Sequence, residues 1–203
     1  MAGPLACPPS MTSMASTAHS ERALIYLSRW RVNAATVLGA AVIVCARPTQ
    51  RAILAFLPLV LLGVAFRVWA RGHLDRHHYV TQTGPYRFVR HPLYIGSFAM
   101  GLGFAAMTGL WFVPPLFVLL YVGSYVPKGL REEAFLRQRY GDEYTGYAAR
   151  VGALWPHLHR APLPAGVRRF EWQRVLGHRE WKTWLGVLAA LAVLWVRATT
   201  AAP

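Results

Sequence analysis

The sequence predicts an all-α, polytopic membrane protein with about five transmembrane helices. Of its 203 residues, 55% are hydrophobic and 15% are charged. The apolar residues form long runs, not the short alternation typical of half-buried strands. One run, Ala52–Ala70, is nearly uncharged. It reaches roughly 28 Å at ~1.5 Å per residue, which is the thickness of a bilayer core.

Five such runs predict the membrane spans in chain order. They cover about residues 32–46, 52–70, 93–107, 110–126 and 181–196. Pro114 and Pro115 in the fourth run predict a kink in that helix. Small residues recur along the third run, Gly101 and Gly103 among them. They predict that another helix approaches this one closely.

The chain divides into three regions on composition. Residues 1–20 are small, polar and proline-containing, and they lack the apolar core of a signal peptide. They predict either a disordered N-terminal tail or a start codon that lies farther along the chain. Residues 21–160 are expected to form the membrane core, and 161–203 a basic cytosolic linker followed by the last span.

The formal net charge of +14 indicates orientation in a membrane, not nucleic-acid binding. Binding to nucleic acid requires a soluble basic face, which this apolar chain lacks. Most arginines and lysines lie before the first span, between the second and third, and between the fourth and fifth, whereas Arg47, Arg51 and Arg197 lie on the other side. The positive-inside rule therefore predicts a cytoplasmic N-terminus and cytoplasmic loops at 71–92 and 128–180.

The segment after the fourth run has aromatic and aliphatic residues at roughly helical spacing, over residues 128–156. Gly141 is expected to end one helix and Asp142 to cap the next. An amphipathic pair of helices lying on the cytosolic membrane surface fits this pattern.

Two polar motifs interrupt the apolar pattern on the predicted cytosolic side. The first is TGPYRFVRHPLYIG at Thr83–Gly96, and the second is the pair Glu132–Glu133. Polar, ring-rich segments at membrane depth are costly unless something binds there. The two glutamates point about 100° apart on a helix, so a carboxylate dyad is not expected. They are either acids favoured near a helix start, or one of them accepts from a ligand hydroxyl or amine.

Histidines around the first motif suggest two further chemistries. His73 and His77 have near-helical spacing that suits a metal, but no third ligand type is evident, so no metal site is expected. His91 precedes Pro92, a pair that often starts a helix. A helix start offers free backbone N–H groups to a carboxylate or phosphate.

Several short motifs follow one another within roughly Leu61–Pro156. They are Val80-Thr81, Gly84-Pro85-Tyr86, Arg90-His91-Pro92-Leu93-Tyr94-Ile95-Gly96, Glu132-Glu133, Tyr140-Gly141 and Glu143-Tyr144. In order and spacing they resemble the isoprenylcysteine carboxyl methyltransferase and phospholipid methyltransferase superfamily. The resemblance implies an integral membrane enzyme that uses S-adenosylmethionine. The cofactor would be bound in a cytosolic cavity roofed by the amphipathic helices after the fourth span.

The resemblance also implies roles for single residues. The cofactor would be lined by His78, Tyr79, Val80, Thr81, Gly84, Tyr86, His91, Pro92, Leu93, Tyr94 and Glu132. Glu132 and Lys128 would be the catalytic residues. Lys128 stands where the family often has an arginine, and lysine keeps the charge but loses the bidentate fork. Arg71 stands where some eukaryotic members have a glutamine near the cofactor.

The partners implied are membrane lipids and a lipophilic or lipid-modified methyl acceptor. The acceptor's nucleophile, whether carboxylate, thiol or amine, stays open. Methyl transfer from a sulfonium is an in-line displacement. It requires alignment and exclusion of water, and neither a metal nor a covalent residue.

Two other classes of protein stay open on the sequence. A membrane reductase of the steroid-reductase type has a similar organisation of spans and loops and uses NADPH, whose ribose phosphate would suit Arg87 and Arg90. A non-catalytic membrane protein would bind a lipid or haem through its histidines. Binding of S-adenosylmethionine against NADPH separates these alternatives.

Overall fold

The computed structural model describes residues 39, 42, 45–75, 80–155 and 169–200. The chain divides into two parts at Cys45, and the part up to Cys45 lies almost wholly outside the described residues. The tail expected at 1–20, nearly all of the span expected at 32–46, and residues 161–168 of the expected linker therefore lie outside them as well.

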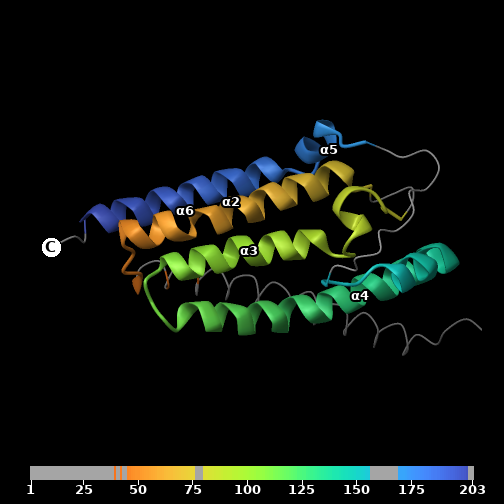
Figure 1. Cartoon of the computed structure of the whole chain (residues 1–203), viewed down its shortest axis with the longest axis horizontal. Helices are drawn as coiled ribbons and strands as arrows, with labels where there is room; N and C mark the ends of the chain where they lie inside the picture. The colour runs from red at the N-terminus through yellow and green to blue at the C-terminus, as the bar shows by residue number, and fades with distance from the viewer. Residues whose placement is uncertain (1–38, 40–41, 43–44, 76–79, 156–168, 201–203) are drawn as a thin grey trace, which may run out of the picture. The chain divides into compact units, whose positions relative to one another are not determined.

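The all-α prediction is confirmed for the described part of the chain. Its elements are α2 (Gln50–His73), the 3₁₀ turn η1 (Gly84–Arg87), α3 (Pro92–Met107), α4 (Val113–Arg150), α5 (Trp172–Gly177) and α6 (Glu180–Thr200) (Figure 1). An isolated parallel bridge joins Val89 to Gly152, and no strand forms in these ranges.

Among the described residues, three helices are long and apolar enough to cross a membrane, namely α2, α4 and α6. The shorter apolar helix α3 has 16 residues. The bounds of α2, α3 and α6 agree with the spans expected at 52–70, 93–107 and 181–196. Leucines such as Leu62, Leu119 and Leu188 are widely exposed on the three long helices. Apolar surface of this extent is characteristic of a membrane protein.

Helix α4 differs from its prediction in two ways. It begins at Val113, so Pro114 and Pro115 lie in its first turn, where backbone N–H groups have no helical partner to lose. The predicted kink at these prolines is therefore wrong. The helix also continues past the apolar run expected at 110–126 as far as Arg150. The predicted break at Gly141 is confirmed, since this residue has φ 53° and ψ −123° inside the helix.

Glycines allow α2 and α3 to pack with their backbones in contact. A Cβ atom on Gly63 would lie 2.6 Å from the carbonyl oxygen of Gly96, and one on Gly103 would lie 2.7 Å from Val60 Cγ2. The close approach predicted from Gly103 is confirmed. Gly101 instead faces an aromatic ring of α4.

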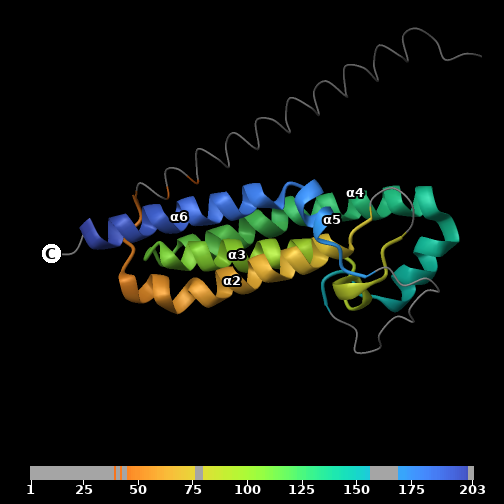
Figure 2. The same cartoon turned by 90° about the horizontal axis from the view of Figure 1, so that it is seen from above.

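The bundle of α2, α3, α4 and α6 has two different ends. At one end, the Arg47 N–H donates to the Thr108 carbonyl at 2.8 Å, and the Arg197 guanidinium donates to the Ala46 carbonyl at 3.1 Å. At the other end, the loop between α2 and α3 lies beside the C-terminal part of α4 (Figure 2). The polar motifs of the sequence gather at this second end.

Candidate functional site

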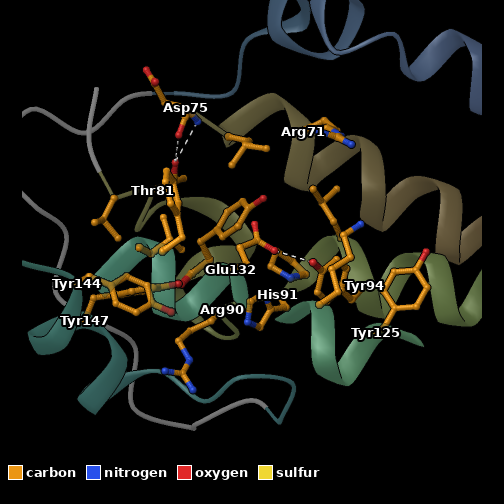
Figure 3. A pocket seen from close by; sticks show the side chains of 18 of the residues that line it. Arg71, Asp75, Thr81, Arg90, His91, Tyr94, Tyr125, Glu132, Tyr144 and Tyr147 are labelled. Carbon is orange, nitrogen blue, oxygen red and sulfur yellow. Dashed lines mark hydrogen bonds between the residues drawn. The ribbon is translucent and has the colours of Figure 1, made fainter. Parts of the chain in front are cut away.

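A cavity of about 720 Å³ opens among the polar motifs. Its volume falls within the range of small-molecule sites, ~300–1,000 Å³. Its walls come from the C-terminal end of α2, the loop with η1, the start of α3 and both parts of α4. In Figure 3, Thr81, Tyr144 and Tyr147 lie on one side, Tyr94 and Tyr125 lie on the other, and Glu132 lies between them.

The loop between α2 and α3 is fixed by its own backbone and by α4. Thr81 Oγ1 accepts from the Asp75 N–H at 3.0 Å and donates to the Asp75 carbonyl at 3.2 Å. Gly84 has φ 57°, which favours glycine, and a Cβ atom there would meet a histidine ring of α2 at 2.5 Å. The turn brings Tyr86 to the cavity, where the Tyr147 hydroxyl donates to its carbonyl oxygen at 2.8 Å.

The two adjacent glutamates of α4 have different partners. Glu132 lines the cavity, and its Oε2 accepts a hydrogen bond from the Tyr94 hydroxyl at 2.6 Å. Glu133 Oε1 lies 3.1 Å from His91 Nε2 and 3.2 Å from an Arg90 Nη atom. The two carboxylates therefore have separate partners and do not form a dyad, in agreement with the sequence analysis. Glu132 faces the cavity, and Glu133 ties the loop to α4.

Lys128 lies one helical turn before Glu132. In the described part of the chain the two side chains form no ion pair. Lys128 Nζ lies 5.6 Å from the centroid of the Tyr94 ring and 5.5 Å from that of Tyr125. A cation at this distance from a ring gains ~0.5–1 kcal/mol at an exposed site. The ammonium group is thus held in the cavity wall beside the Tyr94–Glu132 pair.

Aromatic rings make this wall rigid. The His91 ring stacks on Tyr94 with centroids 5.1 Å apart, and Tyr94 meets Tyr125 edge-on at 5.0 Å. Tyr121 stacks on Tyr125 at 4.0 Å and donates its hydroxyl hydrogen to the Tyr94 carbonyl at 2.7 Å. Packing between α3 and α4 therefore holds the rings of this wall in fixed positions.

The part of α4 after Gly141 forms a roof over the cavity. Tyr144 and Tyr147 are buried against Val80, whose N–H donates to Glu143 Oε1 at 3.3 Å. The buried face of this segment therefore packs on the loop. Its position on the membrane surface stays a prediction. Burial raises the pKa of both phenols, so they stay protonated at neutral pH. Among the described residues, the buried Tyr144 hydroxyl has no hydrogen-bond partner.

The phospholipid methyltransferase family model matches residues 36–143, which is more than half of the chain. The chain belongs to this family. The matched region contains α2, the loop, α3 and α4 up to the residues just after the Gly141 break. Most of the roof and all of α6 follow it in the sequence.

Several curated proteins are similar to this family member over part of their length. The nickel-cobalt-cadmium resistance protein NccN of Alcaligenes xylosoxydans xylosoxydans is 32% identical over 51% of the chain and 51% of its own length. Protein-S-isoprenylcysteine O-methyltransferase of Schizosaccharomyces pombe is 30% identical over 46% of the chain and 39% of its own. The cobalt-zinc-cadmium resistance protein CzcN of Cupriavidus metallidurans is 29% identical over 65% of the chain and 64% of its own. No solved structure matches the chain significantly.

Most of the residues that the resemblance implies do line the cavity of this methyltransferase-family protein. They are Val80, Thr81, Tyr86, His91, Pro92, Leu93, Tyr94 and Glu132, together with Lys128. Gly84 is not among them, because it shapes the turn before Tyr86. His78 and Tyr79 lie outside the described residues, as does His77. Within the described ranges, no three His, Cys, Asp or Glu residues lie close enough to hold a metal ion.

Sequence reasoning missed a buried ion-pair group at the edge of the cavity. Glu180, the first residue of α6, is 2% exposed and accepts from Arg67 Nη2 at 2.8 Å and Arg71 Nε at 2.7 Å. Arg67 also donates to the Ser97 hydroxyl. Both arginines line the cavity. Their spacing of one helical turn was visible in the sequence, but Glu180 follows Arg71 by 109 residues.

Proposed function

We propose that this family member is an integral membrane methyltransferase that takes its methyl group from S-adenosylmethionine and transfers it to a lipophilic acceptor. The observation that carries the proposal is the hydrogen bond from Tyr94 to Glu132 in the wall of the cavity. It joins the two family motifs, which lie 38 residues apart in sequence, in the wall of one cavity of suitable size.

The chemistry of the cavity fits the cofactor. A ribose hydroxyl or an amino group donates hydrogen bonds, and the carboxylate of Glu132 accepts them. The buried Tyr144 hydroxyl has no partner in the described part of the chain. Such a group costs ~1–3 kcal/mol, which a hydrogen bond to a ligand would recover.

The two substrates would occupy different parts of the cavity. The loop from Val80 to Leu93 and the roof would hold the cofactor, since they are the polar and aromatic walls on the side away from the bundle. Arg67, Arg71 and Ser97 come from the membrane helices α2 and α3. That side would admit an acceptor from the lipid.

The reaction requires alignment more than chemical activation by the protein. Bound S-adenosylmethionine would supply the methyl group, and its sulfur would keep the electron pair of the broken bond as S-adenosylhomocysteine leaves. The acceptor's nucleophile would form the new bond to the methyl carbon from the opposite side. The tyrosine wall would fix the line of attack, and the roof would exclude water. A carboxylate or thiolate would attack directly, whereas an amine would give a proton to Glu132 or His91.

The relatives support a lipophilic acceptor. The name of the S. pombe relative specifies a prenylated cysteine, and the family description specifies a phospholipid. Both acceptors would reach the cavity from a membrane. The exposed leucines on α2, α4 and α6 support a membrane location for this protein as well.

The test is binding to the full-length protein in neutral detergent, measured by titration calorimetry with S-adenosylmethionine, S-adenosylhomocysteine and NADPH. The two adenosyl compounds should bind, and NADPH should not. His91→Ala and Tyr94→Ala should each weaken binding by about tenfold, because losing a ring contact costs ~1 kcal/mol or more. Trp111→Ala, at the opposite end of the bundle, is the control. Binding of NADPH alone would refute the proposal and favour a membrane reductase.

A further inference from the structure

Arg71 uses only part of its hydrogen-bonding capacity. Its Nε donates to Glu180, and among the described residues neither of its Nη atoms has a hydrogen-bond partner. Arg67 differs, because it commits its Nη atoms to Ser97 and Glu180. Arg71 lines the cavity, and its side chain is 14% exposed. Arg67 Nε also has no partner in the described part of the chain, but it is buried. The unused donors that a ligand in the cavity can reach therefore belong to Arg71.

The charge of the ion-pair group is not balanced. Glu180 brings one negative charge to two guanidinium groups. A partly buried excess charge is costly unless a counter-ion joins it. The excess lies at Arg67 and Arg71, because Arg90, another base of the cavity lining, has its own acid in Glu133. This end of the cavity therefore favours a ligand with a negative charge.

Arg71 lies at the expected depth of a lipid head group. Trp69 on α2 and Trp181 on α6 are both exposed, beside Arg71 and Glu180 in the sequence. Exposed tryptophans at the ends of membrane helices mark the interface between lipid and water. Farther along α2, exposed Leu62 marks the hydrocarbon side. An amphiphile with its chain in the lipid would carry its head group to Arg71.

We propose that Arg71 binds the anionic head group of the lipophilic acceptor, a carboxylate or a phosphate, through its two Nη groups, and that Glu180 orients it. A planar guanidinium binds either anion in a bidentate manner. The inference rests on the proposed methyl transfer, because it names the charge of the acceptor and the end of the cavity that it occupies. It also makes α6, which follows the family-matched region, a part of the active site.

The test uses dodecanoate and dodecyl phosphate as probes, with dodecanol as the neutral control. Binding to the full-length protein in maltoside detergent is measured with and without S-adenosylhomocysteine. The wild type should bind at least one anionic probe and not dodecanol. Arg71→Gln should weaken that binding about tenfold or more, because hydrogen bonds to charged groups contribute ~1.5–3 kcal/mol. Its affinity for S-adenosylhomocysteine should stay within about twofold.

Two further variants control for folding and for charge. Arg71→Gln leaves Arg67 and Glu180 as a one-to-one pair, so the fold should hold. Arg71→Lys keeps the charge beside Glu180 and should give an intermediate affinity, since it loses the bidentate fork. Arg51→Gln removes the same charge from the opposite end of α2, where the residue is exposed, and should change neither affinity.

Each other outcome has a distinct meaning. If Arg71→Gln weakens S-adenosylhomocysteine and spares the dodecyl probes, Arg71 belongs to the cofactor site and the inference is wrong. The inference is also wrong if dodecanol binds as tightly as the dodecyl anions. It is wrong as well if acetate and inorganic phosphate bind as tightly as the dodecyl anions. If the wild type binds the anionic probes through Arg71 but not S-adenosylhomocysteine, the proposed methyl transfer fails and the anion site stands.

Discussion

At the scale of single residues, the adjacent side chains of Glu132 and Glu133 on α4 have different partners and different roles. Glu132 accepts from Tyr94 in the cavity wall, whereas Glu133 holds Arg90 and His91 of the loop. A helix turns about 100° per residue, so adjacent acids face different partners. The residue pattern alone left open which of the two acids faces the cavity, whereas the family resemblance implied Glu132, which does line it.

Lys128 gives a prediction at this scale. Its ammonium group lies over the Tyr94 and Tyr125 rings and lines the cavity, without pairing with Glu132 among the described residues. Lys128→Ala should keep the affinity for S-adenosylhomocysteine within about threefold, because a cation–π contact contributes ~0.5–1 kcal/mol. It should lose methyl transfer, since the cation would orient an acidic acceptor. Lys128→Arg should retain transfer.

The measurement for Lys128 is calorimetry and radiolabelled methyl transfer on the same preparations. Arg139→Ala, a change on the same helix outside the cavity lining, is the matched control. Near-wild-type transfer by Lys128→Ala would remove this residue from acceptor binding. It would favour a neutral or amine acceptor.

The ion-pair group shows what single-residue reasoning misses. Glu180 stands at the start of the last apolar run, where an acid is favoured by the helix dipole in any case. Its partners Arg67 and Arg71 lie in α2, more than a hundred residues earlier. Nothing in the local pattern distinguishes a buried partner from a solvated flanking charge, because only packing of α6 on α2 brings them together.

At the scale of elements, the break in α4 controls the roof. Gly141 has φ 53°, and a Cβ atom there would find nothing within 4 Å, so only backbone strain opposes a side chain. Residues with a Cβ atom rarely adopt φ 53° with ψ −123°, so Gly141→Ala should destabilise the roof by ~1–2 kcal/mol or more. The affinity for S-adenosylhomocysteine should therefore fall by about five- to thirtyfold.

The matched control for the roof is Gly146→Ala. Gly146 lies in the same part of α4, has open space for a Cβ atom and has no positive φ. Alanine there should be neutral or stabilising, by up to ~1 kcal/mol. Titration calorimetry and limited proteolysis of the two variants provide the comparison. Equal affinities would show that the bend at Gly141 does not position the roof.

The contact between α2 and α3 gives a second prediction for elements. A Cβ atom on Gly63 would lie 2.6 Å from the Gly96 carbonyl oxygen and 2.7 Å from the Met100 backbone nitrogen, so the helices must separate. Gly63→Ala should destabilise the protein by ~1–3 kcal/mol, in the range of overpacked cores. Gly123→Ala has open space and should not. Thermal unfolding in detergent measures both, and equal midpoints would contradict close packing.

The helices themselves could be predicted well, for physical reasons. Long apolar runs fix α2, α3 and α6 to within a few residues, and a glycine with φ above zero breaks α4 where the sequence predicts. The predicted kink at Pro114 failed because its effect depends on position within the helix. In the first turn, proline removes an N–H group that has no partner.

At the scale of the whole chain, the distribution of charge gives a prediction of topology. Thr108, Arg47 and the last turn of α6 meet at the end of the bundle that is remote from the cavity. The basic residues Arg71, Arg90 and Lys128 lie at the cavity end. The positive-inside rule therefore predicts that the cavity faces the cytoplasm.

Reporter fusions check this topology. Fusions after Thr108 and after Pro203 should report the outer side of the membrane, and a fusion after Arg139 should report the cytoplasm. A cytoplasmic signal at Thr108 would reverse the orientation. It would also separate the cavity from cytosolic S-adenosylmethionine.

The most direct measurement is transfer of a radiolabelled methyl group from S-adenosylmethionine into the lipid extract and membrane proteins of cells that produce the full-length chain. Membranes with the wild type should label a lipophilic product. Membranes with Glu132→Gln should not, because the amide lacks the charge that accepts from the ligand and from Tyr94. Glu171→Gln, at the exposed N-cap residue just before α5, should label as the wild type does. Equal labelling by Glu132→Gln, or no label from wild-type protein that binds the cofactor, would contradict a methyltransferase site in this cavity.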